Sequence, residues 1–206
     1  FIGLGIMGAP MAGHLMKAGH KLFVHTRSKV PDEVKAAGAT ACASAREVAN
    51  KADIVITMVP DTPDVEAVLF GENGAASGLG KGKVVIDMSS ISPVETKAFA
   101  KKIEALGADY LDAPVSGGDV GAKNGTLSIM IGGNADTVTA LEPLWKLMGS
   151  KWILQGGSGA GQHTKVVNQV LIASGMIGVC EGLLYGYKAG LDLERVLHVR
   201  PHVGGH

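Results

Sequence analysis

The chain has 206 residues, enough for one large domain or for one domain and the start of a second. Hydrophobic residues make up 46% and charged residues 18%, which predicts a folded protein with a substantial core and excludes general disorder. The 19 Lys and Arg residues balance 19 Asp and Glu residues, which argues against a nucleic-acid binder, and the two cysteines, Cys42 and Cys180, lack the spacing of a disulfide framework or a zinc site.

Short β-type runs alternate along the chain with helix-type segments. Strands are expected at residues 21–25, 53–58, 83–87, 109–112, 126–131 and 151–154. Helices are expected at residues 9–18, 31–37, 45–51, 62–70, 93–106 and 135–148. Beyond Gly161 the pattern changes to one long helical stretch that ends near Ala189.

This alternation predicts an α/β fold of the Rossmann type, doubly wound, with a mostly parallel sheet covered by helices on both faces. We expect residues 1–158 to form that domain. Residues 159–206 are then an interdomain helix followed by the truncated start of an all-helical second domain. The apolar stretch 166–187 contains Asn168, Gln169 and Glu181, so we interpret it as a buried helix and expect no membrane span.

The first glycine-rich motif is Gly3-Leu4-Gly5-Ile6-Met7-Gly8, a GxGxxG that follows apolar residues and opens a helix. The first glycine allows a tight turn, the second lets the backbone approach a pyrophosphate, and the third lets helix and strand pack closely. The motif therefore predicts a dinucleotide site at residues 3–8.

The end of the next strand indicates which dinucleotide is preferred. An NAD site places Asp or Glu there to bind the ribose 2′-hydroxyl, whereas this chain has Thr26, Arg27 and Ser28. Arg27 can bind a 2′-phosphate through two N–H groups, and the two hydroxyls add donors. We expect NADP(H) to be preferred over NAD(H); the alternative is that Arg27 is an ordinary solvated residue of a turn.

Four separated motifs resemble the β-hydroxyacid dehydrogenase family, and the resemblance covers residues 1–197. They are FIGLGIMGAPMA at residues 1–12, DMSSISP at residues 87–93, DAPVSGG at residues 112–118 and GAGQHTKVVNQ at residues 159–169. The sequences of these motifs are most similar to those of the tartronate semialdehyde reductases of the family. The resemblance implies hydride transfer between NADP(H) and a small 3-hydroxy or 3-oxo acid, with reduction of tartronate semialdehyde to glycerate as the expected reaction.

The resemblance also implies roles for particular residues. Lys165 matches the catalytic lysine, which protonates the carbonyl oxygen as hydride arrives, and Asn168 matches the residue that assists it. The substrate carboxylate is expected at Ser116, Gly117 and Gly118, which match the family's substrate loop. Val59, Pro60 and Ser90 match positions beside the cofactor. No metal is implied.

Other interpretations stay open at this point. The chain fits a non-catalytic NADP-binding or oligomerisation module or fragment, or a relative that acts on 3-hydroxyisobutyrate, glyoxylate or succinic semialdehyde. The distantly related 6-phosphogluconate dehydrogenases follow the lysine with a His-Asn pair, where this chain has Asn168 and Gln169, and imine reductases usually lack the lysine. His14 stands where many members have Asn, and we expect it to change only local packing.

Several expectations concern the whole molecule. Only Phe1 and Ile2 precede the glycine motif, and the tail after Leu197, with its helix-breaking Pro201, does not resemble the family, so both ends are expected to be truncated. Without a basic leader, the chain is expected to be cytoplasmic. Its partners are expected to be a small carboxylate-bearing substrate and further copies of itself, with no nucleic acid or membrane.

Overall fold

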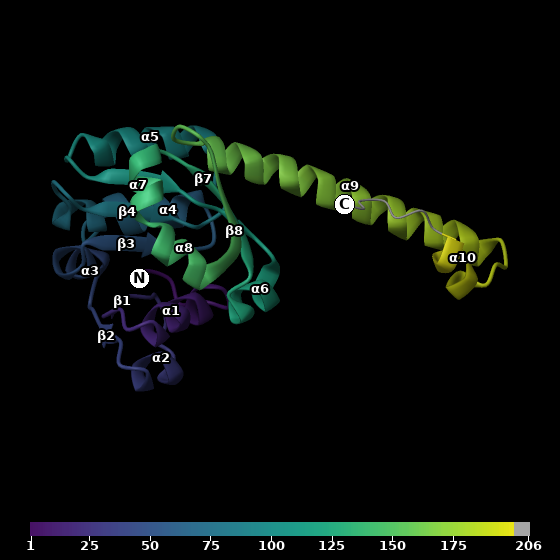
Figure 1. Cartoon of the computed structure of the whole chain (residues 1–206), viewed down its shortest axis with the longest axis horizontal. Coiled ribbons are helices and arrows are strands. Elements are labelled where there is room, and N and C mark those ends of the chain that lie inside the picture. Colours follow the sequence, from purple (N-terminus) through teal and green to yellow (C-terminus); the bar gives the residue numbers. More distant parts are fainter. Residues whose placement is uncertain (200–206) are drawn as a thin grey trace. The chain divides into compact units, whose positions relative to one another are not determined.

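The computed structural model describes residues 1–199, which fall into two compact units: Phe1–Lys165 and the residues from Val166 onward. The first unit is an α/β domain with a mostly parallel sheet, as the sequence predicts (Figure 1). The predicted boundary between residues 158 and 159 stays a prediction.

The central sheet of the first unit has the strand order β3-β4-β5-β7-β6, and β8 pairs with β7. Strands β3, β4 and β5 are parallel, and β7 is antiparallel to β5 and β6 but parallel to β8. Two short strands, β1 and β2, pair in parallel beside it, and Ile2 bridges His25 on one side and Thr57 on the other. The strands are β1 (Phe23–Val24), β2 (Thr40–Ala41), β3 (Ile54–Thr57), β4 (Val84–Asp87), β5 (Asp109–Asp112), β6 (Val115–Ser116), β7 (Leu127–Gly132) and β8 (Gly149–Gly156).

Helices connect these strands and continue beyond them. They are α1 (Gly8–Lys17), α2 (Asp32–Ala36), α3 (Ala45–Lys51), α4 (Thr62–Phe70), the 3-10 turn η1 (Ala75–Gly78), α5 (Pro93–Glu104), α6 (Gly118–Asn124), α7 (Ala135–Ala140), α8 (Glu142–Met148), α9 (Ala160–Lys188) and α10 (Leu193–Val199).

The core lies on both faces of the sheet because successive side chains of a strand point to opposite faces. Val85 and Tyr110 pack in a buried cluster with α3, α4 and α5, whereas their neighbours Ile86 and Leu111 pack in another with α1, α6 and α8. Burial of each such side chain contributes about 1.5–3 kcal/mol. Because helices cover both apolar faces of the sheet, the domain is doubly wound. The loops after β3 and β4 lie at the carboxyl ends of these strands, where a binding site can form.

Some elements differ from the sequence prediction. The single helix expected at 135–148 is two helices, because Leu141 leaves the helical conformation and Pro143 then occupies the first turn of α8, where its missing N–H is tolerated. The glycine-rich segment Gly118–Asn124 forms α6, and Thr40–Ala41 forms β2; neither was expected.

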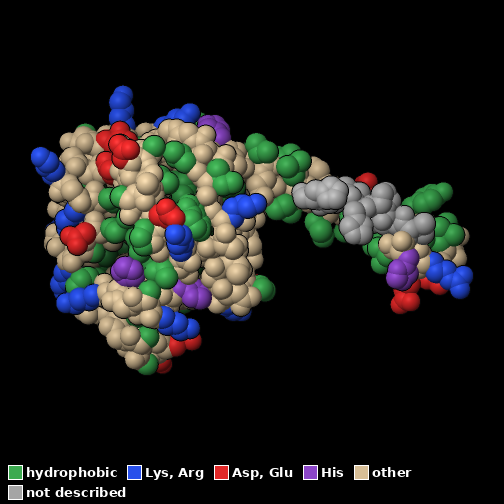
Figure 2. Space-filling model, in the orientation of Figure 1, with side chains coloured by type: hydrophobic (Ala, Val, Ile, Leu, Met, Phe, Trp, Pro, Cys, Tyr) green, Lys and Arg blue, Asp and Glu red, His purple; other side chains and the backbone are tan. Residues whose placement is uncertain are grey.

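The second unit contains the larger part of α9, followed by α10. The prediction that residues 166–187 are buried is wrong for the described residues: Val167, Leu171 and Met176 are 59%, 69% and 59% exposed. Hydrophobic side chains are exposed along the helix, and several of them can be seen on its visible face in Figure 2. By length and composition α9 would be able to cross a membrane, a criterion that core helices of soluble proteins also meet. Pro201, expected to end the helix, lies outside the described residues.

Candidate dinucleotide and active site

Close packing leaves no room for a side chain at two of the three glycines of the first motif. Gly3 has φ +94°, and a Cβ there would lie 2.2 Å from the carbonyl oxygen of Met58. A Cβ on Gly8 would lie 2.0 Å from the carbonyl oxygen of Gly3. Around Gly5, by contrast, no atom lies within 4 Å of the position a Cβ would take. The first and third glycines therefore let the loop pack against β3 and itself, and the second leaves open space in front of the loop.

The same loop presents unused donors toward that space. Within residues 1–199, no group accepts a hydrogen bond from the backbone N–H of Gly5, Ile6 or Met7, and α1 begins at Gly8. Free N–H groups and the positive end of a helix dipole favour phosphate at this point. The loop therefore fits the pyrophosphate of a dinucleotide both in shape and in the chemistry of its donors.

A cleft of about 510 Å³ opens in front of the glycine loop, at the carboxyl ends of β1 and β3. All the residues that the sequence assigns to the cofactor line this one cleft: Gly3, Gly5, Ile6, Met7, Gly8, Thr26, Arg27, Ser28, Val59, Pro60 and Ser90. Open α/β sheets bind ligands at this edge. Their individual roles stay predictions, but the fold brings them together.

Arg27 has a partner in the cleft that the sequence did not indicate. Its Nη1 donates to Oδ1 of Asp64 over 2.8 Å, and both residues line the cleft. Asp64 lies in the first turn of α4, 37 residues from Arg27. Nothing in the local sequence signals such a pair, because only the parallel packing of the strands places the two loops side by side.

Beneath the cleft lies a buried polar cluster around Asp87, at the end of β4. Its carboxylate accepts hydrogen bonds from Thr57 Oγ1 at 2.8 Å, from the N–H of Ser89 at 3.1 Å and from the hydroxyl of Tyr110 at 3.2 Å. The Ser89 hydroxyl in turn accepts from the N–H of Val59 at 3.0 Å, which fixes the loop beside the cofactor cleft. Complete burial raises the pKa of Asp87 to about 6, although these hydrogen bonds oppose the shift.

A second buried cluster holds the start of α9. Asp112, at the end of β5, accepts from the N–H of Gly159 at 2.7 Å and from the N–H of Gln162 at 2.9 Å, and burial raises its pKa. The Gln162 amide donates to the carbonyl of Ser89 at 2.7 Å and accepts from the N–H of Ile91 at 3.1 Å. The first turn of α9 is therefore attached to the ends of both β4 and β5. Asp112 and Gln162 belong to the sequence motifs at residues 112–118 and 159–169, but the sequence does not indicate that the two residues are hydrogen bonded.

Lys165 lies one turn further along α9 and reaches the predicted substrate loop. Its Nζ donates to the carbonyl of Val115 over 2.8 Å, directly before Ser116, Gly117 and Gly118. Partial burial lowers the pKa of the ammonium group. Gly117 and Gly118 have φ +130° and +62°, and a Cβ on Gly118 would meet nothing within 4 Å. The lysine and an open, glycine-rich loop therefore lie next to each other.

Asn168 belongs to the second unit, where its side-chain amide donates to Oε1 of Gln169 at 3.0 Å. Its predicted role beside Lys165 stays a prediction.

His14 is hydrogen bonded to the end of α6. Its Nε2 lies 3.0 Å from the carbonyl oxygen of Ala122 and 3.1 Å from that of Lys123, as a donor to both. The imidazole joins α1, which follows the glycine loop, to the last turn of α6, which follows the predicted substrate loop.

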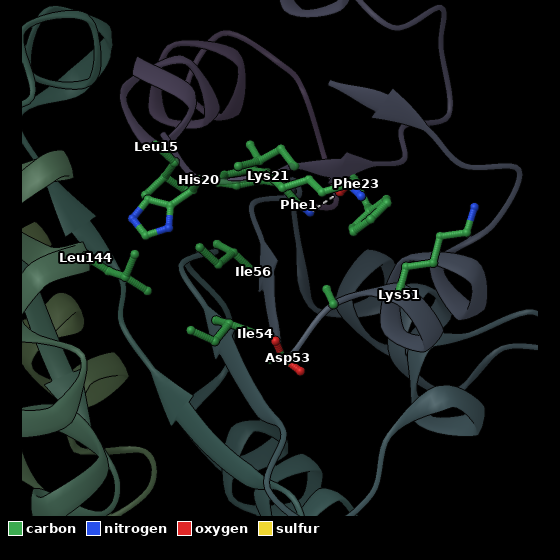
Figure 3. Close-up of a pocket in the computed structure, with 12 residues that line it drawn as sticks. Phe1, Leu15, His20, Lys21, Phe23, Lys51, Asp53, Ile54, Ile56 and Leu144 are labelled. Carbon is green, nitrogen blue, oxygen red and sulfur yellow. Dashed lines mark hydrogen bonds between the residues drawn. The ribbon is translucent and has the colours of Figure 1, made fainter. Parts of the chain in front are cut away.

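Another hollow, of about 350 Å³, lies at the opposite edge of the sheet (Figure 3). Phe23 and Ile54, the first residues of β1 and β3, line it together with Phe1 and Asp53. Because dinucleotide sites form at the carboxyl ends of parallel strands, this hollow is not the cofactor site.

Residues 1–157 match the family described as the NAD binding domain of 6-phosphogluconate dehydrogenase, and residues 159–201 match the NAD-binding domain of NADP-dependent 3-hydroxyisobutyrate dehydrogenase. The chain is 54% identical over 196 residues to 2-hydroxy-3-oxopropionate reductase of Escherichia coli, covering 95% of this chain and 67% of that enzyme.

Solved structures also resemble the chain. The 3-hydroxyisobutyrate dehydrogenase of Mycobacterium tuberculosis, solved with L-serine, has a TM-score of 0.89 and 34% identity over 97% of this chain and 68% of that one. A protein solved in complex with NADP⁺ and 2-OPP has a TM-score of 0.87 and 27% identity, over 97% of this chain and 71% of the other. With its dinucleotide cleft, the lysine beside the glycine-rich loop and these relatives, the chain belongs to the 3-hydroxyisobutyrate dehydrogenase-like β-hydroxyacid dehydrogenases, a family of NAD(P)-dependent oxidoreductases.

Proposed function

We propose that this protein is an NADP(H)-dependent reductase that converts tartronate semialdehyde to glycerate. The observation that carries the proposal is the position of Lys165, whose ammonium group lies against the loop that begins at Ser116. The 54% identity to a 2-hydroxy-3-oxopropionate reductase supports this substrate.

Each part of the site has a defined task in this reaction. The free N–H groups of Gly5, Ile6 and Met7 bind the pyrophosphate, and Arg27 with Thr26 binds the 2′-phosphate. When bound, the reduced nicotinamide supplies the hydride. The backbone N–H groups of the loop 116–118 and the Ser116 hydroxyl bind the substrate carboxylate.

Lys165 carries the proton. The Val115 carbonyl occupies one of the three N–H donors of its ammonium group, which leaves two for the substrate. As hydride adds to the carbonyl carbon, negative charge develops on the oxygen, and Lys165 transfers a proton to it. The neutral amine then regains a proton from solvent. Its lowered pKa makes the proton easier to release than that of an exposed lysine. Reduction should therefore slow as pH rises through the pKa of Lys165, at a pH below the ordinary lysine value of 10.5.

The 3-hydroxyisobutyrate dehydrogenase reaction is the second candidate, because the M. tuberculosis enzyme of that name shares the fold at 34% identity. A comparison of kcat/KM decides between them. Purified protein is assayed by loss of NADPH absorbance with tartronate semialdehyde, methylmalonate semialdehyde and succinic semialdehyde, and in the oxidative direction with 3-hydroxyisobutyrate. The proposal predicts the highest value for tartronate semialdehyde with NADPH. A higher value for another substrate, or for NADH, contradicts that part of it.

The second unit supports a further part of the proposal, assembly into homo-oligomers. Its exposed apolar side chains on α9 form a surface that favours association. Sedimentation of the purified chain measures the oligomeric state directly.

A further inference from the structure

The cofactor cleft contains an acidic side chain that neither the glycine motif nor the Arg27 segment includes. Asp64 lines the cleft from the first turn of α4, and its Oδ1 lies 2.8 Å from Nη1 of Arg27. The Asp64 side chain is 26% exposed, against 78% for Arg27. The carboxylate is thus the more sheltered member of the pair, and most of the Arg27 side chain is exposed.

The two forms of the cofactor differ chemically at the group that Arg27 is proposed to bind. A 2′-phosphate is an anion, so it attracts Arg27 but is repelled by a carboxylate that already binds the same guanidinium. A ribose 2′-hydroxyl carries no charge and donates a hydrogen bond, which a carboxylate accepts well. The same Asp64 oxygen atoms therefore oppose one ligand and favour the other.

We infer that Asp64 is a specificity-determining residue that limits the preference for NADP(H) and retains affinity for NAD(H). This inference rests on the proposed dinucleotide site, with Arg27 at the 2′-position. Asp64 performs the task that an acidic residue at the end of the second strand performs in NAD-specific sites, but it does so from a different loop. Removal of its charge should raise the ratio of NADP⁺ to NAD⁺ affinity about tenfold, the effect of a single nearby, partly screened charge.

Asp64→Asn isolates this charge because the amide keeps the shape of the side chain. Glu66→Gln is the matched control: Glu66 lies on the same helix, is exposed and does not line the cleft, so the variant loses one negative charge elsewhere. Dissociation constants are measured by calorimetry with NADP⁺ and NAD⁺ on the full chain. Adenosine 2′,5′-bisphosphate and adenosine 5′-monophosphate serve as probes that differ only in the 2′-phosphate. Thermal unfolding of each variant checks that the fold is intact.

We expect Asp64→Asn to bind NADP⁺ and the bisphosphate more tightly and NAD⁺ more weakly than wild type does. Glu66→Gln should leave the ratio of NADP⁺ to NAD⁺ affinity unchanged. A ratio that stays within twofold of wild type, or that falls because Asp64 instead orients Arg27, overturns the inference. An equal rise in Glu66→Gln also overturns it, because the effect would then come from net charge.

Failure of the proposed function gives a different pattern. If wild type prefers NAD⁺ while Asp64→Asn shifts the ratio toward NADP⁺, the proposed preference is wrong and the role of Asp64 stands. If Arg27→Ala leaves NADP⁺ affinity unchanged, Arg27 does not bind the 2′-phosphate, and the inference about Asp64, which rests on that contact, is overturned with it. If no variant binds either nucleotide, both proposals are refuted.

Discussion

Replacement of Asp87 by asparagine should remove a pH dependence of stability that originates at the buried end of β4. The Asp87 side chain is completely buried between Thr57, Ser89 and Tyr110, and desolvation raises its pKa from 3.8 to about 6. Asparagine keeps an acceptor for the Ser89 N–H and carries no charge at any pH. The variant therefore separates the cost of burying the charge from the hydrogen bonds of the cluster.

The sign and magnitude follow from linkage. In the unfolded chain this carboxyl has its ordinary pKa, so the native state holds the proton more tightly. The resulting stabilisation is complete below about pH 4 and is lost as pH rises through about 6. One pKa unit corresponds to about 1.4 kcal/mol, so the wild type loses about 2 kcal/mol from this group between pH 4 and 7, part of the effect having been lost already at pH 4. Asp112, whose pKa is also raised, adds to the wild-type trend in the same direction but is unchanged by the substitution.

The assay is urea unfolding of wild type and Asp87→Asn across this pH range, followed by fluorescence of the buried Trp145. The free energy of unfolding of the variant, relative to wild type, should rise by about 2 kcal/mol from pH 4 to 7. Asp53→Asn, at an exposed position, should show no such rise. A flat difference for Asp87→Asn would refute the argument that burial of this carboxylate opposes its ionisation.

Three further substitutions test other parts of the structure. Gly8→Ala should lower the melting temperature and abolish calorimetric NADP⁺ binding, because its Cβ would lie 2.0 Å from a backbone oxygen; unchanged binding contradicts the described loop geometry. His14→Ala should lower the free energy of unfolding by about 1 kcal/mol, because the hydrogen bonds to the end of α6 are lost. An unchanged free energy of unfolding in urea would rule out that link. Gln162→Leu leaves buried backbone groups of Ser89 and Ile91 unpaired and should lower the free energy of unfolding by about 2–4 kcal/mol. A free energy of unfolding close to that of wild type would show that the Gln162 hydrogen bonds do not stabilise the start of α9.

Local sequence signals predicted much of the fold. The helices α3 and α4 begin and end at the residues expected, 45–51 and 62–70. Their starts are fixed by Ser44 and Asp61, whose side-chain oxygen atoms accept hydrogen bonds from the first turns. The alternation of strands and helices predicted the doubly wound sheet. The break within 135–148 depends on Leu141 leaving the helix ahead of Pro143, and a helical apolar pattern continues through both positions.

The site was predictable only where its residues are close in sequence or carry the family resemblance. The glycine loop and the Arg27 segment follow from spacing and strand order. The pairs Arg27–Asp64 and Asp112–Gln162 join residues 37 and 50 positions apart, and only the assembled sheet brings them together. The exposure of α9 was also missed, because an apolar pattern indicates that a helix tends to be buried and does not specify what covers it.

In the proposed reaction Lys165 protonates the substrate, while the glycine loop holds the cofactor independently of it. The most direct test measures NADPH-dependent reduction of tartronate semialdehyde by wild type, Lys165→Ala and the exposed control Lys101→Ala, with NADPH affinity determined separately for each. We expect Lys165→Ala to bind NADPH as wild type does but to turn over at least about a hundredfold more slowly, and Lys101→Ala to match wild type in both affinity and turnover. Undiminished turnover by Lys165→Ala with NADPH bound would contradict this role of Lys165.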